Sequence, residues 1–285
     1  MGTRRIEIAS SYRYETQTPT AAVFLMEAPT TPRAQISEAM VTFDGEDRPG
    51  SGPVHRFTDE MGNHRYRVVL PAGVSTLRWS ALATIPDTLD DDAPRGVALR
   101  PAELPDETLV YTLASRFCES DRLSNEAWRL FGATPGGYDR VRAIMDFVNS
   151  HLTYTSGSSG PSTSALDVLT SGKGVCRDYA HLMVALCRAM NLPARYAFGY
   201  FPDIDWTPDN TPMDFHAWVQ VWIGDGWYDF DPRHNVFRKG KILVGVGRDA
   251  ADTALVTTYG PAALQQLVVD AQEVGTTRTR PYFYG

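Results

Sequence analysis

Gly174-Val175-Cys176-Arg177-Asp178-Tyr179-Ala180 opens the most regular helical pattern of the chain. Apolar side chains then recur along one face, at Tyr179, Leu182, Met183, Leu186 and Met190. Glycines 172 and 174 interrupt whatever precedes this pattern, and Pro193 ends it, because proline disfavours the helical conformation in the residue before it. We therefore predict a helix with Cys176 in its first turn, at the edge of the buried face.

Two strand patterns follow, joined by Gly224-Asp225-Gly226, which is typical of a hairpin turn. His216 begins the first strand, in which successive side chains point to opposite faces of the sheet. A four-residue loop, 223–226, would pair Trp222 with Trp227. That register places His216 and Asp231 on one face, one diagonal step apart and within reach of each other.

A thiol, an imidazole and a carboxylate in this layout are typical of thiol acyl transfer. The thiolate is the attacking form, and both a helix N-terminus and a neighbouring imidazolium favour it. The histidine takes the thiol proton and later returns it to the leaving group, while the carboxylate orients the imidazole. Two other interpretations stay open from the residues alone: Cys176 as a small buried apolar residue and His216 as a core histidine. A carboxylate on the same face argues against the second.

Several short blocks, in this order, resemble the transglutaminase-like superfamily, and more closely its bacterial members described as cysteine proteases. The blocks are Gly174 to Ala180, Leu192-Pro193-Ala194-Arg195 with Gly199-Tyr200, His216-Ala217-Trp218, and Gly226-Trp227 with Asp231-Pro232. The similarity covers about residues 105–250. It implies that Cys176 is the nucleophile, His216 the general base and acid, and Asp231 the residue that orients His216. The segment before residue 90 resembles the β-rich region that often precedes this core.

Two departures from the family pattern concern the surroundings of these residues. Where the family often continues Asp-Pro-Thr, this chain has arginine and then histidine after Pro232. The tryptophan that serves as an oxyanion donor upstream of the cysteine in animal transglutaminases has no counterpart between Trp128 and Cys176. The backbone N–H of Cys176 is one candidate oxyanion donor. Tyr154 is another, with core packing as its alternative role. Trp218 is a candidate pocket residue, together with Trp222 and Trp227, and sheet packing is the alternative for all three.

Composition agrees with a soluble enzyme, and the family resemblance implies a peptide or protein as its substrate. A 285-residue chain with 43% hydrophobic residues can bury a full core, and a net charge of −7 argues against binding nucleic acid or an anionic membrane. There is no apolar run of membrane-spanning length and no signal-peptide pattern at the start, so we expect a cytoplasmic protein. Three cysteines are too few for a disulfide framework. The positions of Cys176, His181 and Cys187 fit no metal-binding spacing, so we expect no metal and no cofactor.

The chain divides on its turn and proline signals into three parts. Residues 1–90 form a β-rich domain, with strands at 4–14, 21–26 and 74–85 and a hairpin over 54–70. Residues 91–105 are a linker, and the acidic run 90–92 is expected to be solvated. Residues 106–285 form the catalytic domain, with helices over 106–131 and 138–152 and a strand over 264–274. The loop 156–161 is either an ordinary connector or a border of the active site, and the tail 275–285 either packs or covers the site.

Together these patterns predict an α+β fold. Its core is papain-like or transglutaminase-like, with a helix that carries the cysteine and an antiparallel sheet that carries the histidine and aspartate. The expected function is thiol-dependent acyl chemistry on peptide or side-chain amides, with hydrolysis first. Transglutaminase-type transfer to an amine is the alternative, because both reactions share the thioester step. A catalytically silent binding or assembly module is the alternative from another class. The sequence does not indicate an oligomeric state.

Overall fold

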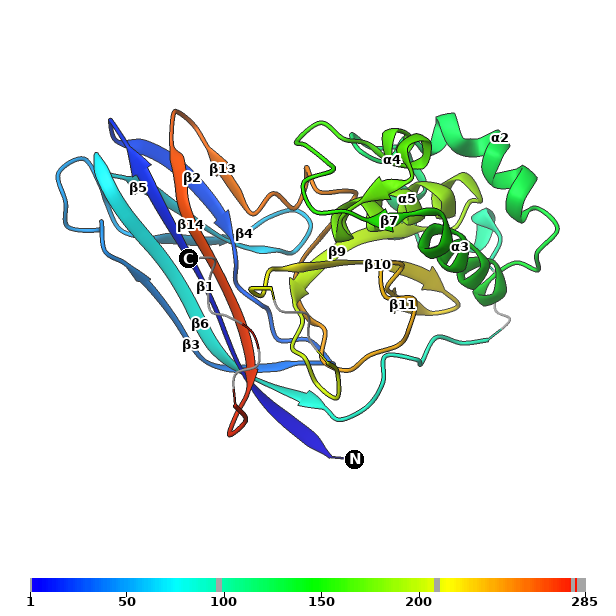
Figure 1. The fold of residues 1–285 in the computed structure, drawn as a ribbon, viewed down its shortest axis with the longest axis horizontal. Helices are drawn as coiled ribbons and strands as arrows, with labels where there is room; N and C mark the ends of the chain where they lie inside the picture. Colours follow the sequence, from blue (N-terminus) through cyan, green and yellow to red (C-terminus); the bar gives the residue numbers. More distant parts are fainter. Residues whose placement is uncertain (1, 96–98, 208–210, 278–279, 281–285) are drawn as a thin grey trace.

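Strands form both ends of the chain and helices gather in its middle, as the computed structural model shows (Figure 1). The structure describes residues 2–95, 99–207, 211–277 and 280. The strands are β1 (Thr3–Thr16), β2 (Thr20–Leu25), β3 (Gln35–Phe43), β4 (His55–Thr58), β5 (His64–Leu70), β6 (Gly73–Pro86), β7 (Thr153–Tyr154), β8 (Lys173–Gly174), β9 (Ala194–Tyr200), β10 (His216–Ile223), β11 (Gly226–Phe230), β12 (Ile242–Gly247), β13 (Val256–Thr258) and β14 (Ala263–Glu273). The helices are η1 (Pro101–Glu103), α1 (Asp106–Leu109), η2 (Val110–Thr112), α2 (Ser120–Phe131), α3 (Tyr138–His151), α4 (Ala165–Ser171) and α5 (Cys176–Ala189).

The β region consists of two four-stranded antiparallel sheets, in the orders β14-β1-β6-β3 and β13-β2-β5-β4. Buried and exposed side chains alternate along β1 and β5, because one face of each strand packs on the core. The strands expected at 4–14, 21–26 and 74–85 and the hairpin over 54–70 are confirmed. β3 was not predicted, since most of its side chains are exposed and give no alternating pattern.

The C-terminal strands belong to this β region by their hydrogen bonding. β14 pairs along β1, and β13 pairs with β2. The strand expected at 264–274 is present, but the assignment of everything from 106 to 285 to the catalytic domain does not hold for residues 256–273. The pairing could not be read from the sequence, because it joins segments that lie about 230 to 270 residues apart. Positions 278–279 and 281–285 of the tail lie outside the described residues.

The other part of the chain, the α+β half, is built around α5, which is buried on nearly all sides. α5 contacts β9 and β10 on one side and α2, α3 and α4 on the other. Its sheet has the order β11-β10-β9-β12 and is antiparallel throughout, which confirms the predicted α+β class and the sheet expected to carry the histidine. The helix expected over 138–152 is confirmed as α3, whereas α4 was not predicted.

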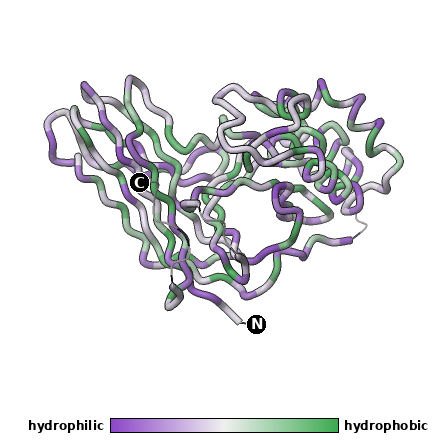
Figure 2. The backbone as a smooth tube through the Cα atoms, in the orientation of Figure 1, coloured by the Kyte–Doolittle hydropathy of each residue, from purple (hydrophilic) through white to green (hydrophobic). Residues whose placement is uncertain are grey.

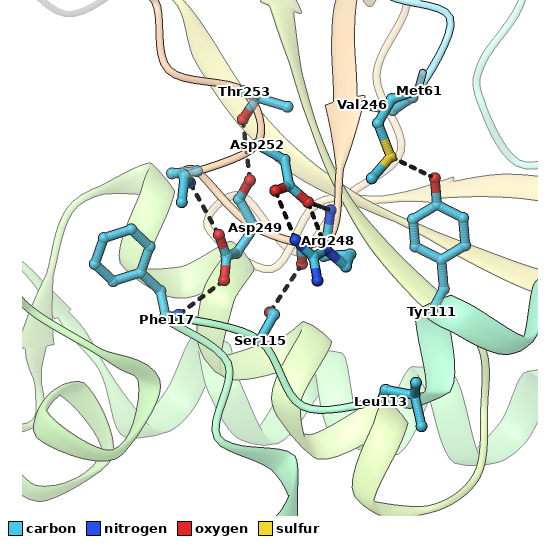
Figure 3. A network of polar contacts seen from close by, with 12 residues as sticks. Met61, Tyr111, Leu113, Ser115, Phe117, Val246, Arg248, Asp249, Asp252 and Thr253 are labelled. Carbon is cyan, nitrogen blue, oxygen red and sulfur yellow. Dashed lines mark hydrogen bonds and ion pairs between the residues drawn. The ribbon is translucent and has the colours of Figure 1, made fainter. Parts of the chain in front are cut away.

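A continuous helix over 106–131 was expected and is wrong. The chain forms α1 and η2, then an irregular stretch, and only then α2. Figure 3 shows what holds the irregular stretch: the Phe117 N–H donates to Asp249 Oδ2 at 2.8 Å, and the Ser115 hydroxyl approaches the Arg248 carbonyl at 3.5 Å. The Asp249 side chain also accepts from the Ala251 N–H. Tertiary contacts to the turn after β12 thus replace the helical hydrogen bonds here.

One hydrophobic core runs from the β region into the α+β half, and Figure 2 shows hydrophobic stretches of chain in both regions. At the junction, the buried Tyr200 hydroxyl lies 3.0 Å from both Ser10 Oγ and the Met26 carbonyl oxygen. The acidic run before the linker also contributes. Asp90, expected to be solvated, is buried and accepts from Lys241 Nζ at 2.8 Å. These contacts fix the β region against the sheet that carries the candidate site.

Candidate active site

The start of α5 places Cys176 where the sequence predicts it, at the first helical residue. The Val175 N–H donates to Asp178 Oδ2 at 2.8 Å, so the Asp178 carboxylate caps the N-terminus of the helix. Gly174 is required for this approach, because a Cβ atom there would lie 2.7 Å from the Asp178 Cβ. The N–H of Cys176 has no acceptor within its own helix and remains the candidate oxyanion donor.

The β10–β11 hairpin has the predicted register. Trp222 faces Trp227, and Ile223 faces Gly226. On its other edge β10 pairs with β9, with His216 opposite Gly199. Because this register fixes which face each side chain takes, it brings the first residue of β10 towards the residue that follows β11.

His216 and Asp231 meet as the register predicts. The His216 Nε2–H donates to Asp231 Oδ2 at 2.8 Å, and both side chains are buried. This contact leaves Nδ1 as the free nitrogen of the His216 ring. Burial lowers the pKa of His216 even though the Asp231 carboxylate opposes the shift. Burial alone would raise the pKa of Asp231, but the two histidines bound to it hold that pKa far below its ordinary value. The pair at rest is thus a neutral imidazole on a carboxylate anion.

The Cys176 thiol, at the start of α5, is half-buried and lies next to the start of β10. Burial and, to a smaller extent, the charge of Asp214 raise its pKa, while the Ala217 N–H and Arg233 lower it, and the net result is a pKa of about 11. Ala217 directly follows His216, so the sulfur lies beside the backbone of the candidate base. Among the described residues no hydrogen bond joins the thiol to His216. A preformed thiolate was expected from the helix start, but these surroundings favour a neutral thiol that gives up its proton during reaction.

A second histidine, His234, contacts the same carboxylate, and no role was predicted for it. The His234 Nδ1–H donates to Asp231 Oδ2 at 2.8 Å. Backbone N–H groups of Arg233 and His234 donate to the other oxygen, Oδ1, at 3.1 and 3.3 Å. The sequence contains a hint of this role, because arginine and histidine follow Pro232 where the family often has threonine. The contact itself depends on the geometry of the turn, which the sequence pattern does not show.

Tyr154 and Trp218, the candidates for an oxyanion donor and a pocket residue, lie in different surroundings. Tyr154 was expected to pack in the core, but its side chain is exposed. It lies opposite Gly174 in the β7–β8 pair, and the Arg233 guanidinium stacks 3.9 Å from the centre of its ring. Trp218 is almost fully buried and donates its indole N–H to Asp229 Oδ1 at 2.8 Å, so it packs in the sheet and has no free donor for an oxyanion.

The loop before α4 borders the start of α5. Arg177, directly after the candidate nucleophile, donates from Nη2 to the Gly160 carbonyl at 3.0 Å and lies 3.2 Å from the Ser159 hydroxyl. Of the two roles considered for residues 156–161, these contacts favour the border of the site. The loop is therefore placed to contact whatever approaches Cys176.

The other cysteines and His181 lie apart from this arrangement. Cys118 and Cys187 are fully buried, and all three cysteines are free thiols. His181 is buried, and its Nε2 accepts from the Ala250 N–H at 3.1 Å. Burial lowers the pKa of His181 to about 3, so it is a neutral core histidine.

One group of described side chains could share a metal ion: His216, Asp231 and His234, whose ligand atoms lie within 4.8 Å of one another. The two N···O contacts of 2.8 Å are hydrogen-bond distances. Ligands about 2.0 Å from a tetrahedral zinc ion would lie about 3.3 Å apart. The geometry therefore favours two imidazole N–H donors on one carboxylate oxygen.

Comparison with known proteins shows what this chain is similar to in sequence and in fold. Residues 128–232 match the family model of the transglutaminase-like superfamily. A solved structure described as a “Putative Cysteine Protease from Cytophaga hutchinsonii” has a TM-score of 0.86, with 29% sequence identity, over 100% of this chain and 95% of that one. No helix in the part of the chain that the structure describes is both long and apolar enough to cross a bilayer.

Curated relatives include proteins from mycobacteria. An uncharacterized protein of Mycobacterium leprae is 41% identical over 117 residues, which is 40% of this chain and 42% of that protein. One from Mycobacterium tuberculosis is 35% identical over 122 residues, 39% of this chain and 38% of that protein. The chain thus spans about two fifths of the length of these relatives. Residues 128–232, which include Cys176, His216 and Asp231, match the core domain of the transglutaminase-like superfamily.

Proposed function

We propose that this protein hydrolyses peptide or side-chain amides through a thioester on Cys176. The observation that carries the proposal is the His216–Asp231 hydrogen bond of 2.8 Å, which occupies Nε2 of the ring and leaves Nδ1 for the thiol proton. The description of the Cytophaga structure as a cysteine protease supports the same reaction class. Cytoplasmic action on a peptide or protein remains part of this proposal.

The proposed reaction has two halves. First, the Cys176 Sγ attacks the amide carbonyl as its proton passes to His216 Nδ1, and the Cys176 N–H stabilises the developing oxyanion. His216 then gives the proton to the leaving nitrogen, so the C–N bond breaks and an acyl thioester and a free amine result. In the second half, His216 takes a proton from water, the hydroxyl attacks the thioester, and the proton returns to the sulfur as the acid leaves. Asp231 stabilises the imidazolium that forms in each half.

A neutral resting pair suits this sequence of proton transfers. Because burial lowers the pKa of His216, its ring is uncharged at neutral pH, so Nδ1 has a lone pair that can take the thiol proton. Because burial raises the pKa of Cys176 to about 11, the thiol keeps its proton until a carbonyl is in place. The ion pair therefore develops in the transition state, where fixed donors contribute most to the rate.

The test compares wild type with Cys176→Ala on a glutamine-containing casein in the presence of a labelled primary amine. New peptide termini, or release of ammonia, are followed by mass spectrometry and by an ammonia assay, and the amine label is counted in parallel. The proposal expects hydrolysis products that require Cys176. Amine incorporation that requires Cys176, without hydrolysis, would show acyl transfer to an amine. Identical results for both proteins across a broad peptide panel would favour a silent binding module.

A further inference from the structure

His234 forms a hydrogen bond to Asp231 of the candidate site, although the usual family pattern, Asp-Pro-Thr, does not include a histidine. Asp231 accepts four hydrogen bonds, two at each oxygen. A carboxylate anion has only acceptors, so the ring nitrogens that contact Oδ2, Nε2 of His216 and Nδ1 of His234, must both carry protons. The same oxygen therefore serves two imidazoles.

The turn that carries both residues is held by its own backbone and by α3. The Asn235 N–H donates to the Asp231 carbonyl at 2.8 Å. The Asn149 amide, from α3, donates to the carbonyls of Pro232 and Arg233 at 3.0 and 2.8 Å. The turn thus fixes the backbone at Asp231, while the Oδ2 position is set by the two side-chain donors.

Aromatic rings confine the two imidazoles. The Phe201 ring stacks on His216 with centroids 5.0 Å apart and meets His234 edge-on at 5.9 Å. Trp206 meets His234 from another side at 5.5 Å. The Arg238 guanidinium lies 4.1 Å from the centroids of both aromatic rings. His234 is therefore held in one orientation, with only its Nδ1–H directed at Asp231.

We propose that His234 is a positioning residue: its Nδ1–H holds the Asp231 carboxylate in the orientation that keeps His216 Nδ1 available to the thiol, and a positive charge on His234 would compete with imidazolium formation at His216. This inference rests on the proposed function for its catalytic consequence and on geometry alone for the hydrogen bonds. The other charged groups around the pair are Asp214, Arg233, Arg238 and Lys241, and each acts electrostatically on Cys176, His216 or Asp231.

Two variants separate the two parts of the proposal. In His234→Asn the amide nitrogen occupies the place of Nδ1 and donates without ever becoming charged. In His234→Ala the donor is lost. The rate at which iodoacetamide labels Cys176, followed by mass spectrometry at several pH values, reports whether His216 can take the thiol proton. His55→Asn, at an exposed position in β4, is the matched control for the loss of a histidine.

At neutral pH we expect His234→Ala to slow the labelling by about tenfold, the scale for loss of an outer partner that orients a functional histidine. His234→Asn should stay within about twofold of wild type. In both variants the loss of rate on acidification should begin at higher pH, because His234 lowers the pKa of His216 electrostatically and its removal ends that effect. Unchanged rate and pH profile in both variants would overturn the proposal, and so would equal slowing in both.

A measurement independent of reactivity tests the same hydrogen bonds. Proton NMR of the wild type should show two slowly exchanging imidazole N–H signals far downfield, one for each donor to Asp231. His234→Asn should remove one and shift the other. A single signal in the wild type, or a remaining signal that does not shift, would contradict the shared carboxylate. If both signals appear but Cys176 proves unreactive, the geometric inference stands and the proposed function fails.

Discussion

The β region and the transglutaminase-like core are assembled in different ways. In the core, Cys176, His216 and Asp231 lie within 56 residues of one another, and one helix start and one hairpin carry all three. In the β region, β14 pairs with β1 across almost the whole chain. Local signals therefore specify the candidate site, whereas its surroundings depend on long-range pairing. The following predictions separate the site from the structure that holds it, in order of decreasing effect.

The largest effect is expected at Asp231. Asp231→Asn keeps the size of the side chain but cannot stabilise an imidazolium at His216 by charge. We expect amide hydrolysis to fall by roughly 10²–10⁴-fold, the range known for general acid–base groups and their orienting carboxylates. Thermal unfolding measured on the same sample serves as the control. A loss of activity below about threefold in a folded variant would refute the role of Asp231.

The second prediction concerns the buried helix behind the site. The pKa of His181 is lowered to about 3, so below about pH 6.5 the unfolded chain binds a proton that the folded chain does not. Stability therefore falls as pH falls, because the unfolded state takes up more protons. Between about pH 6.5 and 4.5, His181 alone should remove about 2 kcal/mol from the free energy of unfolding.

The measurement is urea unfolding at several pH values for wild type and His181→Gln. The glutamine amide oxygen can take the place of Nε2 as acceptor for the Ala250 N–H, and it does not titrate. The variant should lose less stability on acidification than wild type, by about the same 2 kcal/mol. Parallel curves for the two proteins would show that His181 does not contribute to acid sensitivity.

The smallest effect tests the junction between the two regions. Tyr200→Phe removes a hydroxyl that lies 3.0 Å from Ser10 Oγ and from the Met26 carbonyl, both in the β region. We expect a loss of about 1 kcal/mol in the free energy of unfolding, because buried polar groups lose a partner. Tyr259→Phe, at an exposed side chain, should change it by less than about 0.5 kcal/mol. Equal effects at the two positions would show that the junction contact is not stabilising.

The sequence predicts the site better than its surroundings, for physical reasons. The turn 223–226 sets the strand register, and the register sets the faces of His216 and Asp231. The glycines and apolar spacing around Cys176 likewise determine where α5 begins. His234, Asp90 and β13 were misjudged or missed, because their roles depend on partners supplied by the folded chain. A run of charged or polar residues in the sequence does not show which partners the side chains will have in the fold.

The most direct test of the central claim is the relative reactivity of the three thiols. Cys118 and Cys187 are fully buried, with pKa values raised to about 12 by burial, whereas Cys176 is half-buried beside the start of β10. Brief labelling of the folded protein with iodoacetamide, followed by peptide mapping, should modify Cys176 well before the other two, and His216→Ala should slow that labelling. If Cys176 reacts no faster than Cys118 or Cys187, or if its rate is the same without His216, the assignment of a thiol–imidazole site is wrong.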